Sequence, residues 1–243
     1  MLIYCASLPS ATLFSVPVYD YAIANEELAN MSMKEYFTCC GKSICGGCVH
    51  SFIQSGNSEK CPFCKADLRG KTDEERVEEM MKRVEANDAG AMCVLSSYYD
   101  NGSGGLLQDG EIAKELLIMA AELGYSHAHF KLGNRYADGG DLMNAKLYYE
   151  AAAMAGHEVA RYNLGSIEGN SGNLDRAMKH WIIAASAGNH EAMNYLRDAF
   201  EDGLFSRGTI DTILSAYNNS CSEMRSEARE KFINNRIDHI GAR

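Results

Sequence analysis

The segment AKLYYEAAAMAGHEVARYNLG, residues 145–165, carries the strongest structural signal in this 243-residue chain, because its features recur at a fixed interval. Its glycine, Gly156, has counterparts at Gly124 and Gly188, so the three glycines follow one another every 32 residues. An alanine pair precedes each of them: Ala120-Ala121, Ala152-Ala153 and Ala184-Ala185. A period of this length is typical of repeat proteins, in which each unit packs only against its neighbours.

Small and bulky residues keep the same offsets from the three glycines. The positions eleven before, seven before and four after them hold Ala113, Ala145 and Ala177; Leu117, Tyr149 and Trp181; and Ala128, Ala160 and Ala192. Spacings of three, four and seven place residues on one helix face, and small side chains let two helices approach closely. We therefore predict that each unit is a helical hairpin.

The second half of the unit has its own pattern, an alanine, a leucine, a small residue and an aromatic residue. The clearest copy is Ala128, Leu132, Gly133 and Tyr136. In the third copy Glu168 takes the place of the aromatic residue. We predict helix breaks at 138–141 and 168–172, and left-handed helix ends at Gly124, Gly156 and Gly188.

This pattern resembles the Sel-one-like repeat family, which is related to tetratricopeptide repeats, over Ala91–Gly203. The resemblance implies a mainly α fold, a right-handed α/α superhelix of helical hairpins that acts as a protein-assembly scaffold. Members of the family typically have somewhat longer repeats. The first copy also carries a glycine-rich insertion within Asp100–Glu111, and loop insertions often mark a binding edge.

The chain is predicted to contain five parts. They are a poorly defined N-terminal segment (1–36), a zinc-binding module (37–70), a connecting helix (71–90), the repeats (91–203) and C-terminal capping helices (204–243). Within the last part, one helical stripe is formed by Met224, Ala228, Phe232, Ile237 and Ile240. We interpret this stripe as closing the superhelix, and the alternative is a docking helix for a partner.

Charge and hydropathy limit the classes of partner. The formal net charge of −10 argues against binding to nucleic acid or to an anionic membrane, since phosphate groups need a clustered positive surface. No run of residues approaches the roughly 20 apolar positions of a membrane-spanning helix. Proteins are therefore the expected partners.

Six of the nine cysteines fall within 26 residues, at Cys39, Cys40, Cys45, Cys48, Cys61 and Cys64. Two pairs have the spacing Cys-x-x-Cys, which lets two thiolates on one tight turn bind a single Zn²⁺ ion. This clustering suits zinc ligation better than a disulfide framework, and it indicates a reducing compartment, the cytoplasm or the nucleus. Cys93 and Cys221 lie in predicted helices, where we expect buried side chains without a chemical role.

The order of these cysteines resembles the RING finger, in which two zinc ions are held by alternate pairs of ligands. By that resemblance Cys40 takes the third ligand position, Cys45 and Cys48 the fifth and sixth, and Cys61 and Cys64 the seventh and eighth. The opening Cys-x-x-Cys of the family is missing, and Lys42 stands where the family usually has histidine.

Several ligand sets remain open from the sequence. In one, Cys39 replaces the missing histidine, and Cys39, Cys40, Cys61 and Cys64 complete one site. In another, Cys45, Cys48, Cys61 and Cys64 surround one zinc ion, as in a zinc ribbon. Two further alternatives are that the thiols bind no metal, and that the missing ligands lie upstream of Met1.

The RING resemblance implies a ubiquitin ligase, which has no catalytic nucleophile and acts by positioning a ubiquitin-conjugating enzyme. The superhelix would then recruit a client protein. By resemblance, the surface for the conjugating enzyme includes Ile44, Pro62 and Phe63, and Lys65 stands where a basic residue contacts ubiquitin. The alternative is a non-catalytic scaffold or adaptor in which the zinc module is only structural.

Overall fold

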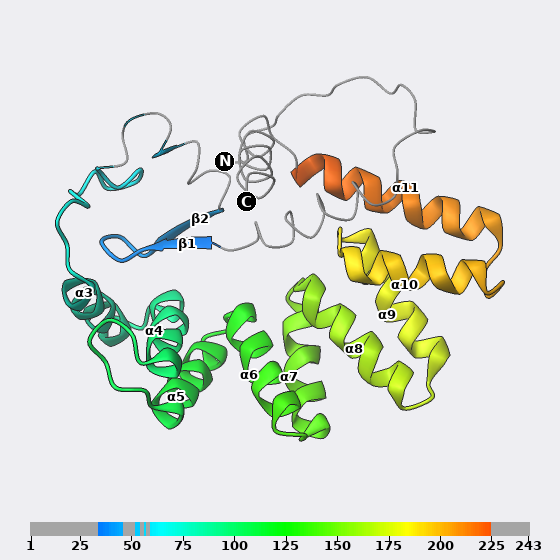
Figure 1. The fold of residues 1–243 in the computed structure, drawn as a ribbon, viewed down its shortest axis with the longest axis horizontal. Coiled ribbons are helices and arrows are strands. Elements are labelled where there is room, and N and C mark those ends of the chain that lie inside the picture. The colour runs from blue at the N-terminus through cyan, green and yellow to red at the C-terminus, as the bar shows by residue number, and fades with distance from the viewer. Residues whose placement is uncertain (1–33, 46–51, 54–55, 57–58, 225–243) are drawn as a thin grey trace, which may run out of the picture.

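The computed structural model describes residues 34–45, 52, 53, 56 and 59–224. In this part of the chain a two-stranded hairpin precedes a series of helices that follow an arc, with α11 at the far end (Figure 1). The predicted stripe beyond Met224 and the N-terminal segment before Lys34 lie outside the described residues. The predictions for those segments therefore remain predictions.

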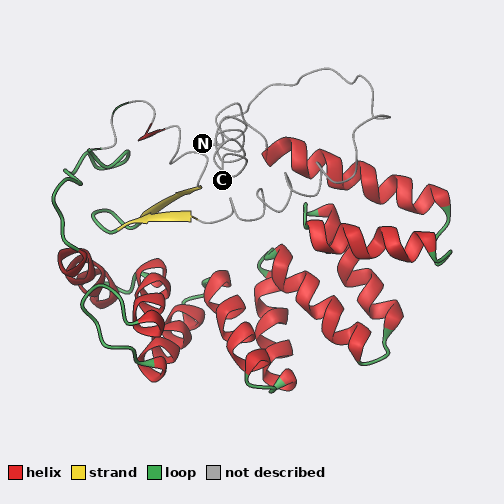
Figure 2. Ribbon diagram, in the orientation of Figure 1, coloured by secondary structure: helices red, strands yellow, loops and turns green. Residues whose placement is uncertain are grey.

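Nearly all of the described chain after residue 72 is helical, as Figure 2 shows. Strands β1 (Lys34–Phe37) and β2 (Lys42–Cys45) pair in antiparallel register, with Phe37 opposite Lys42. The helices are α3 (Asp73–Glu85), α4 (Ala89–Asn101), α5 (Gly110–Glu122), α6 (Ser126–Asp138), α7 (Leu142–Met154), α8 (Glu158–Asn170), α9 (Leu174–Ser186), α10 (His190–Glu201) and α11 (Arg207–Met224). None of these helices is long and apolar enough to cross a lipid bilayer.

The predicted helical hairpins are confirmed. Packing is most extensive between α4 and α5, between α6 and α7, and between α8 and α9. The φ angles of Gly124, Gly156 and Gly188 are 79°, 85° and 91°, a left-handed conformation that other residues adopt only with strain. The 32-residue period therefore arises because the chain reversals after α5, α7 and α9 each require a glycine.

The helices approach one another through alanine and glycine. Ala145 of α7 and Ala160 of α8 are fully buried, as are their counterparts in the other repeats. A Cβ atom at Gly133 of α6 would lie 2.5 Å from Cδ1 of Tyr149 on α7, and Gly165 of α8 is equally tight against Trp181. Each small residue thus makes room for the bulky ring of the following helix.

Glu168 stands at a position where the other repeats have an aromatic residue. The predicted helix break at 168–172 is confirmed, since α8 ends at Asn170, and Glu168 itself is still part of the helix. Glu168 lies in the last turn of the helix and is 1% exposed. Its carboxylate accepts hydrogen bonds from Lys146 of α7 and from Asn173. These bonds, with the Lys146 bond first, hold the pKa of Glu168 below its usual value.

Replacing Gly133 with alanine is predicted to destabilise the fold, because the new methyl group would collide with the ring of Tyr149. We expect the free energy of unfolding to fall by about 1–3 kcal/mol in urea titrations. The control is Gly208→Ala in α11, where a Cβ atom meets nothing within 4 Å. That variant should be neutral or more stable by up to about 1 kcal/mol. Equal stability of the two variants would contradict the packing account.

Glu168→Gln is predicted to destabilise the protein by about 1–3 kcal/mol at pH 7, because it weakens charge-assisted hydrogen bonds. Since the folded-state pKa of Glu168 is lowered, its contribution is present above the unfolded pKa of about 4.3 and is lost as pH falls. The difference between wild type and variant should therefore shrink below about pH 4. Urea titrations at pH 7 and at about pH 3 measure this, with Glu78→Gln on the exposed side of α3 as control.

Candidate metal centre

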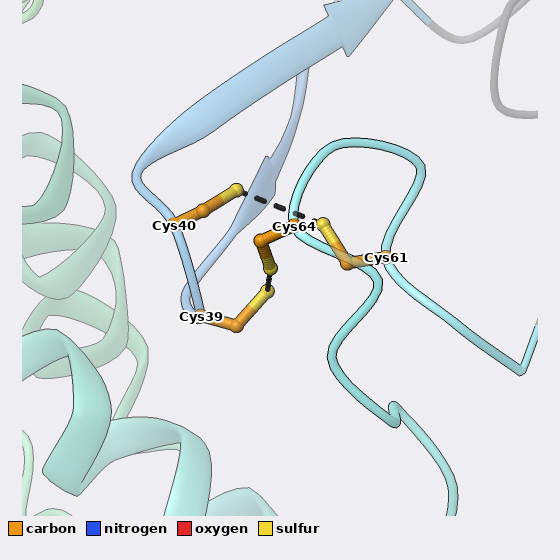
Figure 3. A group of neighbouring side chains, drawn as sticks. All are labelled: Cys39, Cys40, Cys61 and Cys64. Carbon is orange, nitrogen blue, oxygen red and sulfur yellow. Dashed lines mark hydrogen bonds between the residues drawn. The ribbon is translucent and has the colours of Figure 1, made fainter.

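Two short turns bring four cysteine side chains together. The turn between β1 and β2 carries Cys39 and Cys40, and a second turn, closed by pairing of Lys60 with Asp67, carries Cys61 and Cys64. Figure 3 shows the four sulfur atoms pointing toward a common centre from the two turns.

The spacing of the sulfur atoms fits one tetrahedral zinc ion. All four lie within 4.8 Å of one another, with 3.6 Å between the Cys40 and Cys61 sulfurs and 3.5 Å between those of Cys39 and Cys64. Zinc–sulfur bonds of about 2.3 Å place the sulfurs of a tetrahedron about 3.8 Å apart. Four thiolate ligands make a closed site of the structural type, which leaves no position for a substrate.

The two turns have the same backbone design. Gly41 donates its backbone N–H to the carbonyl of Phe37 at 2.8 Å, and Lys65 does the same to the carbonyl of Cys61 at 3.1 Å. Gly41 and Lys65 are both left-handed, with φ of 69° and 63°. In this comparison Phe37 takes the place of Cys61. The first turn therefore lacks its leading cysteine, and Cys39 supplies the second sulfur instead.

The surroundings lower the pKa of one thiol, Cys61, and raise the pKa of two others, Cys39 and Cys40. Burial alone would raise the pKa of Cys61, but hydrogen bonds from the backbone N–H groups of Cys64 and Phe63 lower it to about 7. Burial raises the pKa of Cys39 and of Cys40. Neighbouring thiolates repel one another, so a cation is needed to hold all four in the deprotonated form.

The structure describes some of the other predicted site residues only in part. Cys45 ends β2 opposite Lys34, but its side chain, the side chain of Ile44 and all of Cys48 lie outside the described residues. Metal binding by Cys45 and Cys48 remains a prediction. Cys93 and Cys221 are buried in α4 and α11, as expected for cysteines without a chemical role.

Of the residues predicted to contact a conjugating enzyme, Pro62, Phe63 and Lys65 lie on the second turn, and Ile44 lies on β2. The ring of Phe63 is 37% exposed and packs edge-on against Phe37, with centroids 5.9 Å apart. The ammonium group of Lys42 lies 5.3 Å from the centroid of the same ring. Lys65 donates a hydrogen bond to the carbonyl of Pro62 at 3.0 Å, so its side chain lies back across the turn.

The hairpins that carry the four cysteines contact α3 and the start of α4 through polar side chains. The sequence did not predict these contacts. Tyr36 donates a hydrogen bond to Asp88 at 2.8 Å, and the Thr38 hydroxyl donates to Glu79 at 2.5 Å. Arg83 donates to the carbonyl of Thr38 and pairs with Asp88. The only sequence signal for this contact was the turn just before α4, where Asp88 also accepts from the backbone of Ala91 as an N-cap.

Comparison with models of known families gave no match, and comparison with curated proteins gave none either. Among solved structures, a Sel1 repeat protein from Oxalobacter formigenes is 32% identical, and the match covers 50% of this chain and 97% of that protein, with a TM-score of 0.46. This chain belongs to the Sel1 repeat family.

Two other solved structures were found beside that Sel1 repeat protein. One is a protective antigen from uropathogenic Escherichia coli strains that displays an SLR fold, with 18% identity, a TM-score of 0.48, and coverage of 76% of this chain and 43% of the antigen. The other is an immunity protein from Pseudomonas aeruginosa, with 18% identity, a TM-score of 0.40, and coverage of 73% and 83%.

We predict that the four-cysteine centre of this Sel1 repeat protein binds one zinc ion. Cys40→Ser and Cys61→Ser should each lose one equivalent of zinc, because three thiolates no longer close the tetrahedron. Cys93→Ser should keep the full content, since Cys93 lies in the helical core. Inductively coupled plasma mass spectrometry of the purified proteins measures the ratio. Loss of zinc in Cys45→Ser with retention in Cys40→Ser would contradict this ligand set and support the ribbon arrangement.

Proposed function

We propose that this chain is a protein-binding scaffold, in which zinc-binding hairpins form a metal-stabilised cap on the first helices of a Sel1 superhelix. One observation carries the proposal, the direct contact of the four-cysteine hairpins with α3 and α4 through Tyr36, Thr38, Arg83 and Asp88. When bound, zinc supplies a cross-link between the two hairpins. The polar contacts then connect the cross-linked hairpins to Asp88, the N-cap of α4.

The closed ligand set supports a structural role for the metal. Catalytic zinc sites keep an open position for water or substrate, and four cysteine ligands leave none. The superhelix offers an extended surface of the kind with which repeat proteins bind other proteins. The four free thiols need a reducing environment, so we propose the cytoplasm or the nucleus as the place of action.

The finer hypothesis is a RING-type ubiquitin ligase, and the grouping of the cysteines favours it over a zinc ribbon. Cys39 and Cys40 lie with Cys61 and Cys64, a grouping that the alternate ligand pairing of a RING finger predicts and that a ribbon of Cys45, Cys48, Cys61 and Cys64 does not. The exposed ring of Phe63 is consistent with a contact to a ubiquitin-conjugating enzyme. On this hypothesis Pro62 and Ile44 complete that contact. The side chain of Lys65 would give up its hydrogen bond to the carbonyl of Pro62 and contact ubiquitin instead.

Cross-linking mass spectrometry on the full-length chain purified from cells tests the scaffold. We expect client proteins cross-linked to the segment 89–201 in both the wild type and Cys61→Ser, since the helical cores there do not include the metal. Cross-links to the segment 34–70 should decrease in Cys61→Ser. A chain that reproducibly cross-links to no protein through α4–α10 would contradict the scaffold.

A reconstituted ubiquitination reaction with a panel of conjugating enzymes separates the two hypotheses. The scaffold predicts no ubiquitin chain formation above background by the wild-type protein. The ligase hypothesis predicts chain formation that falls at least tenfold in Cys61→Ser and in Phe63→Ala, and that is unchanged in Leu204→Ala. Such metal-dependent chain formation would favour the ligase over the non-catalytic scaffold, and zinc would order the surface that positions the conjugating enzyme.

A further inference from the structure

Exposed apolar side chains gather on one set of helices. The outward sides of α5, α7 and α9, named here the α5–α7–α9 face, carry the large apolar residues Ile112, Met119, Met143, Leu147, Met154 and Ile183. The alternating helices α4, α6, α8 and α10 contribute only Tyr195 to the exposed large apolar residues of the described chain. The arc in Figure 1 shows the two sets alternating along the superhelix. Exposed apolar side chains that cluster on one part of a surface are typical of interaction sites.

The apolar character of α7 is not required by the repeat. Met143, Leu147 and Met154 are 81%, 58% and 86% exposed, and their spacing of four and seven residues forms one stripe along the helix. The equivalent positions 32 residues earlier and later hold Glu111, Glu115 and Glu122, and Asp175, Lys179 and Ser186. Since polar residues serve at the same places in the neighbouring repeats, packing does not explain the stripe.

Helices α5, α7 and α9 hold equivalent places in successive repeats, so their equivalent positions lie on the same side of the superhelix. Burial raises the pKa of Tyr148 on α7, and the nearby carboxylate of Glu122 on α5 raises it further. Burial lowers the pKa of His180 on α9, and Glu150 of α7 acts on it in the opposite direction. Glu122 of α5 and Glu150 of α7 thus each act electrostatically on a side chain of the next helix in this set.

The face is acidic on its α5 side. Glu111, Glu115 and Glu122 are exposed, and none of them forms an ion pair with another described residue. The cation on the same helix, Lys114, lies 5.4 Å from the ring of Tyr136 and is only partly exposed. The α9 side carries Lys179. A partner on the stripe therefore meets negative charge along α5.

We infer that the α5–α7–α9 face is a docking surface for a basic amphipathic helix of a partner protein. This inference rests on the proposed scaffold function and names one of its binding surfaces. The apolar side of the partner helix lies along Met143, Leu147 and Met154, and its lysine or arginine residues face the carboxylates of α5. Helix-in-groove recognition uses anchors with this helical spacing, and methionine adapts its shape to such ligands.

Fluorescence anisotropy with the full-length, zinc-loaded chain tests the inference. The probe is a labelled 18-residue peptide of leucine and lysine with one apolar face, and the comparison peptide has glutamate in place of lysine. We expect the lysine peptide to bind at least tenfold more tightly than the glutamate peptide. The variant Met143→Gln/Leu147→Gln/Met154→Gln should weaken binding of the lysine peptide at least tenfold, and Glu111→Gln/Glu115→Gln/Glu122→Gln should weaken it and reduce its salt dependence.

Matched variants elsewhere on the surface control for nonspecific attraction to an acidic protein. Leu107→Gln/Leu204→Gln removes exposed apolar side chains, and Glu78→Gln/Glu85→Gln/Asp202→Asn changes the net charge by the same amount as the α5 variant. Both should leave binding unchanged within twofold. All the substituted side chains are exposed, so circular dichroism should show an intact fold for every variant.

Three results would overturn the inference. They are no binding of the lysine peptide, equal weakening by the control variants, and concentration-dependent self-association that the α7 variant abolishes, which would make a second copy the occupant. Failure of the scaffold is distinguishable from these results. Clients that cross-link to helices outside the face, and that the α7 variant does not affect, would keep the scaffold and exclude this docking surface.

Discussion

The close approach of paired helices at a glycine and a facing aromatic ring is the constraint on which the superhelix depends. Gly133 against Tyr149 and Gly165 against Trp181 leave no space for one additional methyl group. A crossing this tight fixes which side of each helix is buried. The opposite side is then free of packing demands, and the difference between α7 and its neighbouring repeats arises on that free side.

The repeats could be predicted from the sequence because each of their constraints occurs more than once. A single glycine such as Gly156 is weak evidence for a helix end, but three with left-handed φ angles at one spacing are strong evidence. Glu168 could not be predicted in the same way. Its burial depends on Lys146, which is distant in sequence and is brought near only by the pairing of α7 with α8. Local propensity cannot report such a contact.

The cysteine site was predictable in its chemistry but not in its ligand grouping. The spacing of Cys61 and Cys64 indicates a metal-binding turn, yet the first turn hides the same backbone design because Phe37 stands in the place of its leading cysteine. The choice of Cys39 depends on the register of β1 with β2, which puts Phe37 opposite Lys42 and closes a turn over residues 38–41. Strand register depends on how two strands pair in the folded protein. The sequence alone therefore could not decide between the set with Cys39 and Cys40 and the set with Cys45 and Cys48.

The position of the four-cysteine hairpins indicates why a Sel1 superhelix would carry them. A stack of helical hairpins leaves its first helices without a preceding repeat, and solenoids need a polar cap at such an end. Asp88 starts α4 as its N-cap and also accepts the hydroxyl of Tyr36, so one carboxylate serves the first repeat helix and the hairpin together. Gly41 lies close to the side-chain ends of Arg83 and Asp88, and its left-handed φ of 69° strains any residue with a Cβ atom there. A small hairpin pair cannot bury enough apolar surface to stay ordered alone, and a closed four-cysteine site is a means of ordering it without a large core. On the proposed function, zinc orders the hairpin pair and the hairpin pair covers the first repeat helices, whether or not the exposed turn at Phe63 also binds an enzyme.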